Sequence, residues 1–353
     1  MIKSLELKNI RLFKNNSFSF NKNIVIFKGM NAVGKTTLLE SIYFSIMLKS
    51  PRTSDDFDLI SFGANLGVIK LFANKEYKVV LNKEKKAFIN DIEVKSLKEY
   101  IGINNVVMFS PNDLDLVYGS PSIRRKFLDI NISQISKAYL NNLTEYKKVL
   151  KLRNDILKVE KIDNILLNVT TDKLIELAKE IIKFRYEFIK EINDNLIGIS
   201  DELIELEYSP STSFKSINED FNKSLELDIF NKCTNKGPHR DDIIFKIDKK
   251  ESIYASQGQV RSLVLALKLT LIKLIKKYKN NNPIILLDDV LSELDDYRRN
   301  RLFKLLNSDF QIFISTTELN NIDPKVLDKA QIIELKKDMW NWSHVFFLYS
   351  FIT

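Results

Sequence analysis

One eight-residue segment near the N-terminus has the residue types and spacing of a phosphate-binding loop. Residues 29–36 read Gly-Met-Asn-Ala-Val-Gly-Lys-Thr and match the pattern GxxxxGK[ST], between a strand-like and a helix-like segment. In this pattern backbone amides converge on phosphate oxygens, the lysine reaches the β- and γ-phosphates, and the hydroxyl binds Mg²⁺. The alternative is a glycine turn without a ligand. We predict that ATP binds at Gly29, Met30, Asn31, Ala32, Val33, Gly34, Lys35, Thr36 and Thr37, with Lys35 catalytic and Thr36 a metal ligand.

An apolar segment that ends in two aspartates supplies the carboxylates that such a loop needs. Residues 283–289 read Pro-Ile-Ile-Leu-Leu-Asp-Asp, the pattern of a Walker B strand. We expect Asp288 to hold Mg²⁺ through water, and Asp289 to orient or deprotonate the attacking water as a catalytic residue. A capped turn after a core strand is the alternative interpretation. More than 250 residues separate Lys35 from Asp288, which is too long for a minimal kinase or GTPase.

A third element lies about thirty residues before these acids. Residues 256–259 read Ser-Gln-Gly-Gln and begin a strongly periodic helix, whose first amides can bind a phosphate. Because the phosphate loop already holds the nucleotide from one side, we expect this element to cap ATP bound to a second copy of the chain. The predicted cap residues are Ser256, Gly258 and Gln259, and they imply an ATP-dependent homodimer. A plain helix cap is the alternative.

Two kinds of secondary structure must position these motifs. Strands are expected at 5–10, 23–27, 68–73, 77–81, 106–109, 204–208, 242–247 and 284–287, and helices at 36–48 and from Gly258. In between, apolar residues recur at steps of three or four from 128 to 146 and again from 174 to 192. These two stripes predict two long antiparallel helices.

This order of sheet, helical block and sheet predicts an α/β P-loop ATPase head that is built from both chain ends and carries an inserted helical arm domain. We expect residues 1–112 and 231–338 to form the head and residues 113–230 the arm, although the helical block could also be an independent domain. Residues 339–353 form an atypical aromatic tail that holds both tryptophans. A core strand, a partner-binding tail and a reading-frame accident are its possible origins, and the last two are favoured over a membrane anchor.

The composition limits the class of protein. The 353 residues include 44% hydrophobic residues, which argues against a disordered chain, and 54 Lys and Arg against 46 Asp and Glu give a net charge of +8. One cysteine and two histidines exclude a disulfide scaffold and an ordinary Cys/His zinc cluster. No uncharged apolar run reaches the length of about 18 residues that a spanning helix needs. The charged N-terminus argues against secretion, so we expect a cytoplasmic protein without a membrane partner.

The phosphate loop, Ser-x-Gly-Gln, Leu-Leu-Asp-Asp and the Ser-Glu-Leu-Asp of residues 292–295 resemble, in this order, the ATPase head of the ABC/SMC class. This resemblance places Asp295 in the D-loop at a nucleotide-bound dimer interface. Further blocks resemble the RecF family of bacterial recombination proteins, from residue 1 to about 336. They are Phe-Ser-Pro-Asn-Asp-Leu at 109–114, Gly-Ser-Pro at 119–121, Arg-Arg-Lys-Phe-Leu-Asp at 124–129, Leu-Arg-Asn at 152–154 and Lys-Gly-Pro-His-Arg-Asp-Asp at 236–242.

The resemblance implies a cytoplasmic protein of DNA repair and replication that dimerises on ATP, binds double-stranded DNA, and works with RecO and RecR to help load recombinase at gaps. It also implies slow, DNA-dependent ATP hydrolysis that acts as a release switch. The nucleotide-binding subunit of a transporter and a DNA-binding protein with a vestigial ATP site are the competing hypotheses. The intact phosphate loop and paired aspartates argue against a vestigial ATP site.

Some positions depart from the transporter pattern. Thr317 stands where the switch histidine would lie, and Asn112 or Asp113 would have to replace the Q-loop glutamine. His239 lies in a Gly-Pro turn, so we expect it to form structural hydrogen bonds and take no part in catalysis. Cys233 is expected to be a small side chain and not a nucleophile.

Residues for DNA binding are predicted from charge alone. Duplex binding needs several Lys and Arg at phosphate spacing, without base readout, so the expected binding is sensitive to salt and insensitive to sequence. For any single residue, a solvated helix face is the alternative. The candidates are Arg124, Arg125, Lys126, Lys147, Lys148, Lys151 and Arg153.

Overall fold

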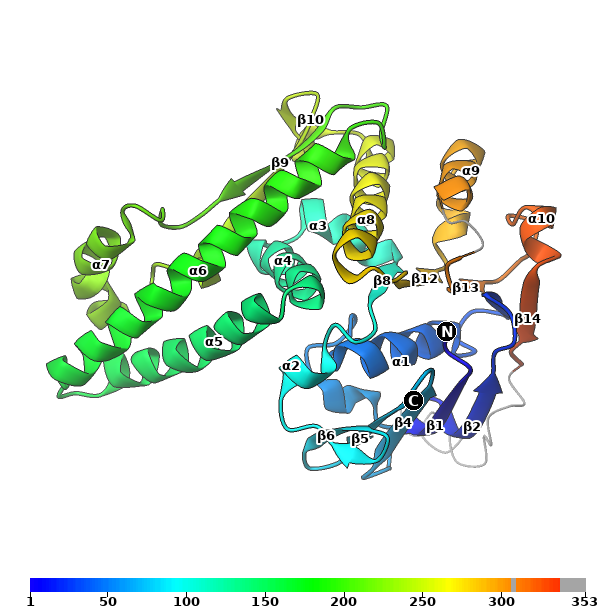
Figure 1. The fold of residues 1–353 in the computed structure, drawn as a ribbon, viewed down its shortest axis with the longest axis horizontal. Coiled ribbons are helices and arrows are strands. Elements are labelled where there is room, and N and C mark those ends of the chain that lie inside the picture. Colours follow the sequence, from blue (N-terminus) through cyan, green and yellow to red (C-terminus); the bar gives the residue numbers. More distant parts are fainter. Residues whose placement is uncertain (306–308, 337–353) are drawn as a thin grey trace, which may run out of the picture. The chain divides into compact units, whose positions relative to one another are not determined.

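The structure is a computed structural model that describes residues 1–305 and 309–336 (Figure 1). The chain divides into two compact units, one formed by residues 1–111 with the segment from residue 282 onward, the other by residues 112–281. The head and arm division expected from the sequence instead assigns residues 231–281 to the head. That functional division stays a prediction, and the tail of residues 339–353 lies outside the described residues.

The centre of the first unit is a five-stranded sheet in the order β14-β3-β13-β12-β8, in which all neighbours are parallel. Its strands are β3 (Ile24–Lys28), β8 (Val106–Phe109), β12 (Ile284–Asp288), β13 (Ile312–Thr316) and β14 (Ala330–Glu334). Every residue of β8, β12 and β13 is buried, as expected for apolar strands covered on both faces. Both ends of the chain therefore build one sheet, as the sequence predicts.

A second sheet of the first unit is antiparallel, in the order β2-β1-β4-β5-β6-β7. Helix α1 (Lys35–Met47) packs against strands of both sheets, and all its residues except Thr36 are buried. The strands are β1 (Ser4–Ile10), β2 (Phe13–Ser19), β4 (Gly67–Phe72), β5 (Glu76–Leu81), β6 (Lys85–Ile89) and β7 (Ile92–Glu93). Short helices complete this unit: η1 (Asp56–Leu59), α2 (Leu97–Tyr100), η5 (Val290–Ser292), α9 (Asp296–Leu305) and α10 (Pro324–Leu327).

The second unit is mainly helical. Its helices α5 (Lys137–Lys158) and α6 (Asn164–Leu196) lie side by side, and the buried stripe of α6 is the one expected over residues 174–192 (Figure 1). A small antiparallel sheet has the order β11-β10-β9, with β9 (Ile204–Ser209), β10 (Asp242–Ile247) and β11 (Lys250–Glu251). The remaining helices are α3 (Asp115–Tyr118), α4 (Pro121–Ile135), α7 (Ile217–Asn231) and α8 (Gln257–Lys279), with η3 (Pro238–Arg240) and η4 (Ser252–Tyr254). The 3-10 turn η2 (Pro111–Leu114) begins where the two units meet in the sequence.

One predicted element is wrong. The apolar stripe from 128 to 146 does not form one helix, because the chain is extended at Ser136 (φ −126°, ψ 111°) between α4 and α5. The Ser136 hydroxyl accepts the backbone N–H of Tyr139 at 3.1 Å and so caps α5.

The expected strands are all present, with bounds within one residue of the prediction. Among the described residues, no helix is long and apolar enough to cross a membrane.

Candidate nucleotide-binding site

Residues 29–34 form a tight loop between β3 and α1, and Lys35 and Thr36 are the first two residues of α1. Gly34 and Ala32 have positive φ, 99° and 64°, so the backbone turns in a way that L side chains rarely allow. A Cβ at Gly29 would lie 2.7 Å from the carbonyl oxygen of Leu335 and 2.8 Å from Cγ2 of Val33. No side chain fits at Gly29, and the loop is shaped by close backbone approach.

The ammonium group of Lys35 lies at this loop and is almost fully buried. Its Nζ donates hydrogen bonds to the carbonyl oxygens of Gly29 and Met30, at 2.9 and 3.1 Å. The same Nζ lies 4.0 Å from Oδ2 of Asp289. The structure therefore brings together the two residues that the sequence predicts to be catalytic.

The buried carboxylate of Asp288 lies at the other side of the loop. Its Oδ1 accepts a hydrogen bond from Thr36 Oγ1 at 2.9 Å and another from Ser315 Oγ at 2.8 Å. Burial raises the pKa of Asp288, and the charge of Asp289 adds to this, while the two hydroxyl hydrogen bonds and the charge of Arg52 lower the pKa. Adjacent hydroxyl and carboxylate oxygens are the ligands that Mg²⁺ uses beside a nucleotide, so this pair fits the expected metal.

Asp289 has a different environment from its neighbour. Its backbone is in the left-handed region (φ 51°, ψ 15°), its N–H donates to Ser315 Oγ at 2.9 Å, and its side chain is 35% exposed. One acid is therefore buried in a hydrogen-bonded pocket, and the next is open to water. This difference suits a metal ligand followed by a residue that activates water.

Two residues beside this site are not among those predicted from the sequence. Ser315 touches both aspartates, and the guanidinium of Arg52 lies 3.6 Å from Glu40 Oε2 and is close enough to Asp288 to lower its pKa. Ser315 lies two residues before Thr317, in the segment that the sequence assigns to the switch-histidine position. Recognition of β13 as a strand beside β12 would have placed it opposite Asp288. Thr317, the expected counterpart of that histidine, is exposed and follows the end of β13.

The Ser-x-Gly-Gln element begins α8 in the second unit. Ser256 Oγ accepts the backbone N–H of Gln259 at 3.3 Å, and Gln259 Oε1 accepts the backbone N–H of Ser256 at 3.1 Å. This capping box leaves Ser256 exposed. In the first unit, Asp295 accepts the backbone N–H of Arg298 at 2.8 Å. The cap is thus established within one copy, and contact of Ser256, Gly258, Gln259 and Asp295 with a second nucleotide stays a prediction.

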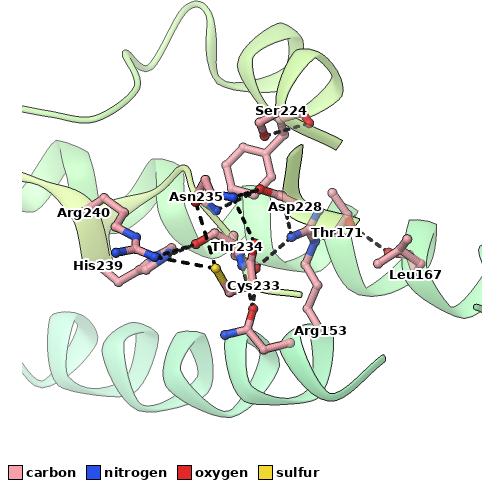
Figure 2. A network of polar contacts seen from close by, with 12 residues as sticks. Arg153, Leu167, Thr171, Ser224, Asp228, Cys233, Thr234, Asn235, His239 and Arg240 are labelled. Carbon is pink, nitrogen blue, oxygen red and sulfur yellow. Dashed lines mark hydrogen bonds and ion pairs between the residues drawn. The ribbon is translucent and has the colours of Figure 1, made fainter. Parts of the chain in front are cut away.

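Among the residues proposed to bind DNA, Arg153 is the clearest correction. It is fully buried, and its Nη1 lies 2.8 Å from Asp228 Oδ2 and 2.7 Å from Thr234 Oγ1 (Figure 2). The prediction that Arg153 lies on the exposed polar side of its helix is wrong. A buried guanidinium with a carboxylate partner cannot reach a phosphate group.

The other six candidates fall into two groups. Arg124 forms a two-point ion pair with Asp242, at 2.6 and 3.0 Å, and Arg125 donates to the Asp241 carbonyl oxygen at 2.8 Å. These two arginines already hold α4 to the start of β10 and to the residue before it. The lysines Lys126, Lys147, Lys148 and Lys151 are exposed and remain candidates.

The turn that contains His239 is structural. His239 Nδ1 is 2.7 Å from the Tyr146 hydroxyl and Nε2 is 3.0 Å from the Thr234 carbonyl oxygen, which confirms the expected hydrogen-bonding role. Burial lowers the pKa of His239 to about 4. A Cβ at Gly237 would lie 2.5 Å from the Tyr146 hydroxyl, so a glycine is needed there.

Arg185 extends this network and is almost fully buried. It donates to Asp241 at 2.9 Å, to Asp129 at 2.8 Å and to the Pro238 carbonyl oxygen at 2.7 Å.

Asp113, one of the two residues considered for the Q-loop position, pairs with Lys268 at 2.9 Å within the second unit. The motifs that carry the family resemblance in this unit therefore hold its helices and small sheet together.

Comparison with known proteins matches residues 1–335 to the family model described as RecF/RecN/SMC N terminal domain. The chain is 41% identical to the DNA replication and repair protein RecF of Bacillus cytotoxicus, over 95% of this chain and 96% of the relative. It is also 41% identical to the protein of that name from Streptococcus gordonii, over 91% of this chain and 94% of the relative.

Solved structures agree with this assignment. A structure described as the recombination mediator protein RecF-ATP in the RecFOR pathway has a TM-score of 0.85 and 32% identity, covering 91% of this chain and 93% of that chain. An SMC head bound to the C-winged helix domain of ScpA has a TM-score of 0.52 and 18% identity, covering 96% of both chains, and shows the shared fold alone. The α/β fold of an ABC/SMC-type P-loop head with helical insertion, the order of motifs and these similarities lead to one conclusion: the chain belongs to the RecF family of DNA replication and repair proteins.

Proposed function

We propose that this chain is an ATP-switched, DNA-binding protein of recombinational repair and replication maintenance. It binds ATP with Mg²⁺, dimerises around the nucleotide, binds duplex DNA, and hydrolyses ATP slowly to release it. The observation that carries the proposal is the cluster of Lys35, Thr36, Asp288 and Asp289 around a phosphate-binding loop.

The nucleotide proposal is supported by geometry and by similar proteins. Residues 29–37 present the loop and the first turn of α1, where backbone N–H groups and the helix N-terminus favour a bound phosphate. Two structures similar to this one at 32% identity are described as RecF-ATP and RecF-ATPrS. The match to relatives along more than nine-tenths of the chain supports transfer of ATP binding to this protein.

Each residue at the loop has a proposed role. Lys35 neutralises charge on the β- and γ-phosphates, and Thr36 with Asp288 holds Mg²⁺. When bound, the metal neutralises the charge that develops on the phosphates. Asp289, which is partly exposed and near Lys35, orients or deprotonates the attacking water.

The dimer proposal rests on the exposed capping box of α8. Ser256, Gly258 and Gln259 would present the first amides of that helix to ATP on a second copy, and Asp295 would lie at the same interface. The capping box fixes Ser256 at the exposed start of α8, and its hydroxyl, which donates to Gln259 Oε1 at 3.2 Å, would exchange this partner for the phosphate of the second copy's ATP.

DNA binding is proposed to use exposed lysines of the second unit, namely Lys126, Lys147, Lys148 and Lys151. Family membership supports a cytoplasmic protein that acts with RecO and RecR and helps load recombinase at gaps. Binding through phosphates alone would weaken steeply with salt and show no sequence preference.

Steady-state ATP hydrolysis by the purified protein, with and without duplex DNA at low and high salt, tests the proposal. We expect slow turnover that DNA stimulates and that salt returns to the basal rate. The Asp289→Asn variant is the blank, since it keeps the phosphate loop but loses the water-activating carboxylate. Turnover in the parent that equals this blank would reject ATP hydrolysis. Turnover that is indifferent to DNA would reject the DNA-linked switch.

A further inference from the structure

A single buried hydroxyl joins the two aspartates at the end of β12. Ser315 lies on β13, opposite Asp288 in the parallel register, and its side chain is fully buried. Its Oγ donates to Asp288 Oδ1 at 2.8 Å and accepts the backbone N–H of Asp289 at 2.9 Å. One serine thus holds the side chain of the first acid and the backbone of the second.

The contact with Asp289 fixes an unusual backbone conformation. A non-glycine residue in the left-handed region persists only where its surroundings hold it. The hydrogen bond to Ser315 is one such contact, and the Asp289 carbonyl oxygen accepts a second from Ser292 Oγ at 2.7 Å. This turn decides where the Asp289 carboxylate lies relative to Lys35.

The contact with Asp288 comes from the scaffold and not from the phosphate loop. Asp288 Oδ1 has two hydroxyl partners, Thr36 on the first turn of α1 and Ser315 on β13. Thr36 is itself a proposed metal ligand, whereas Ser315 can keep its hydrogen bond while Thr36 changes partner. Residues behind a metal ligand commonly set the direction of its lone pairs in this way.

We propose that Ser315 is a positioning residue that sets the Asp288 and Asp289 carboxylates in one geometry through a single hydroxyl. The inference rests on the proposed function, and Ser315 acts through its contacts with the two aspartates. Loss of such a partner commonly weakens metal binding or activity by about 10–100-fold. Loss of the Ser315 hydroxyl should therefore weaken Mg²⁺ binding and lower the turnover rate, and it should leave the affinity for nucleotide without metal unchanged.

The test uses two variants of the full chain that differ in one group. Ser315→Thr keeps the hydroxyl, and Ser315→Val has the same shape as the threonine variant without it, so both carry the same crowding in the buried strand. Three quantities are measured: the affinity for a fluorescent ATP analogue in EDTA, the Mg²⁺ concentration that half-saturates analogue binding, and kcat with KM for ATP.

We expect Ser315→Thr to stay near the parent in all three quantities. For Ser315→Val, we expect the half-saturating Mg²⁺ concentration to rise about tenfold and kcat to fall by a similar factor, with unchanged affinity in EDTA. Ser45→Ala is a matched control, because it removes another fully buried serine hydroxyl, one that donates to the Ser41 carbonyl oxygen within α1 at 2.8 Å. This control should behave as the parent.

Equal Mg²⁺ requirement and kcat in Ser315→Thr and Ser315→Val would overturn the positioning role. Equal losses of analogue affinity in EDTA and of Mg²⁺ affinity would also overturn it, because they would indicate general damage to the fold. A parent protein that binds the analogue no better with Mg²⁺ than in EDTA would instead reject the proposed ATP site, and this inference with it.

Discussion

Arg153 on α5 and Asp228 on α7 form an ion pair of 2.8 Å whose two side chains are both fully buried, although 75 residues separate them in the sequence. Asp228 also accepts the backbone N–H and the side-chain amide of Asn235, each at 2.9 Å (Figure 2). The pair therefore anchors α7 and the chain that follows it to α5. Its role is the cohesion of the second unit and not the attraction of a ligand.

Removal of one partner of the Arg153–Asp228 ion pair should lower the free energy of unfolding. Arg153→Met leaves Asp228 as a buried charge without its ion-pair partner, so we expect a loss of about 3–5 kcal/mol in the free energy of unfolding, measured by urea titration. Lys151→Met removes an exposed positive charge two residues away and should change stability by no more than about 0.5 kcal/mol. Equal stability of these two variants would contradict the anchoring role.

His239 should make the protein less stable in mild acid. Burial lowers the pKa of His239 from 6.5 to about 4, so the unfolded chain binds a proton in this range that the folded chain does not. The stabilisation is complete above the unfolded pKa and is lost as the pH falls from 6.5 toward 4. Between about pH 7.5 and pH 5 the expected loss is about 2 kcal/mol, measured by urea unfolding. His239→Gln should lack this share of the pH dependence. An unchanged dependence in the variant would refute the assignment.

Lys35→Ala and Asp289→Asn should separate nucleotide binding from turnover. Without its ammonium group, Lys35→Ala should bind ATP at least about tenfold more weakly and should not form the ATP-dependent dimer. Asp289→Asn should keep the dimer and lose about a hundredfold or more in turnover, because the water-activating carboxylate is gone. Analytical ultracentrifugation with ATP checks both. Monomers in the parent and in both variants would eliminate the dimer model.

Ser256→Asp should block dimer formation without damaging the fold. Aspartate caps helices as well as serine does, so α8 should keep its stability, while the added negative charge would repel a phosphate of the second nucleotide. Ser256→Arg should also block the dimer, at a cost of about 1 kcal/mol for the lost cap. Ser136→Asp makes the same exchange at the N-cap of α5 and should dimerise as the parent does. Undiminished ATP-dependent dimer formation by Ser256→Asp would argue against the phosphate-capping role.

Eight of the fourteen strands in the described part of the chain, and the phosphate site, could be predicted because their signals are local. Apolar runs and alternation marked β1, β3, β4, β5, β8, β9, β10 and β12, and the phosphate loop and paired aspartates each lie within eight residues. Strands such as β6 and β7 carry charged residues and owe their place to pairing with a neighbour, which no local pattern shows. The link from Ser315 to the two aspartates depends on the parallel register of β12 and β13, and so it could not be seen in either segment alone.

The burial of Arg153 has a signal in the sequence, in the spacing of residues along α5. Tyr139, Tyr146 and Arg153 are spaced seven residues apart, and seven residues make about two helical turns, so all three share one face of α5. The first two are buried, and the arginine follows them inward. The charge of Arg153 suggests a surface position, whereas its place on the helix indicates a buried one. A buried arginine needs a carboxylate partner, and this partner, Asp228, lies far along the chain.

The order of the parallel sheet has a consequence for synthesis on the ribosome. Strand β3, which leads into the phosphate loop, pairs on one side with β13 and on the other with β14, and both begin more than 280 residues further along the chain. Until then β3 has neither of its neighbours, and the backbone of Leu335, against which Gly29 packs, does not yet exist. Until those two strands have been made, a nascent chain therefore carries the complete phosphate motif without the support that shapes it, and we expect the loop to reach its nucleotide-binding geometry only once β13 and β14 have emerged.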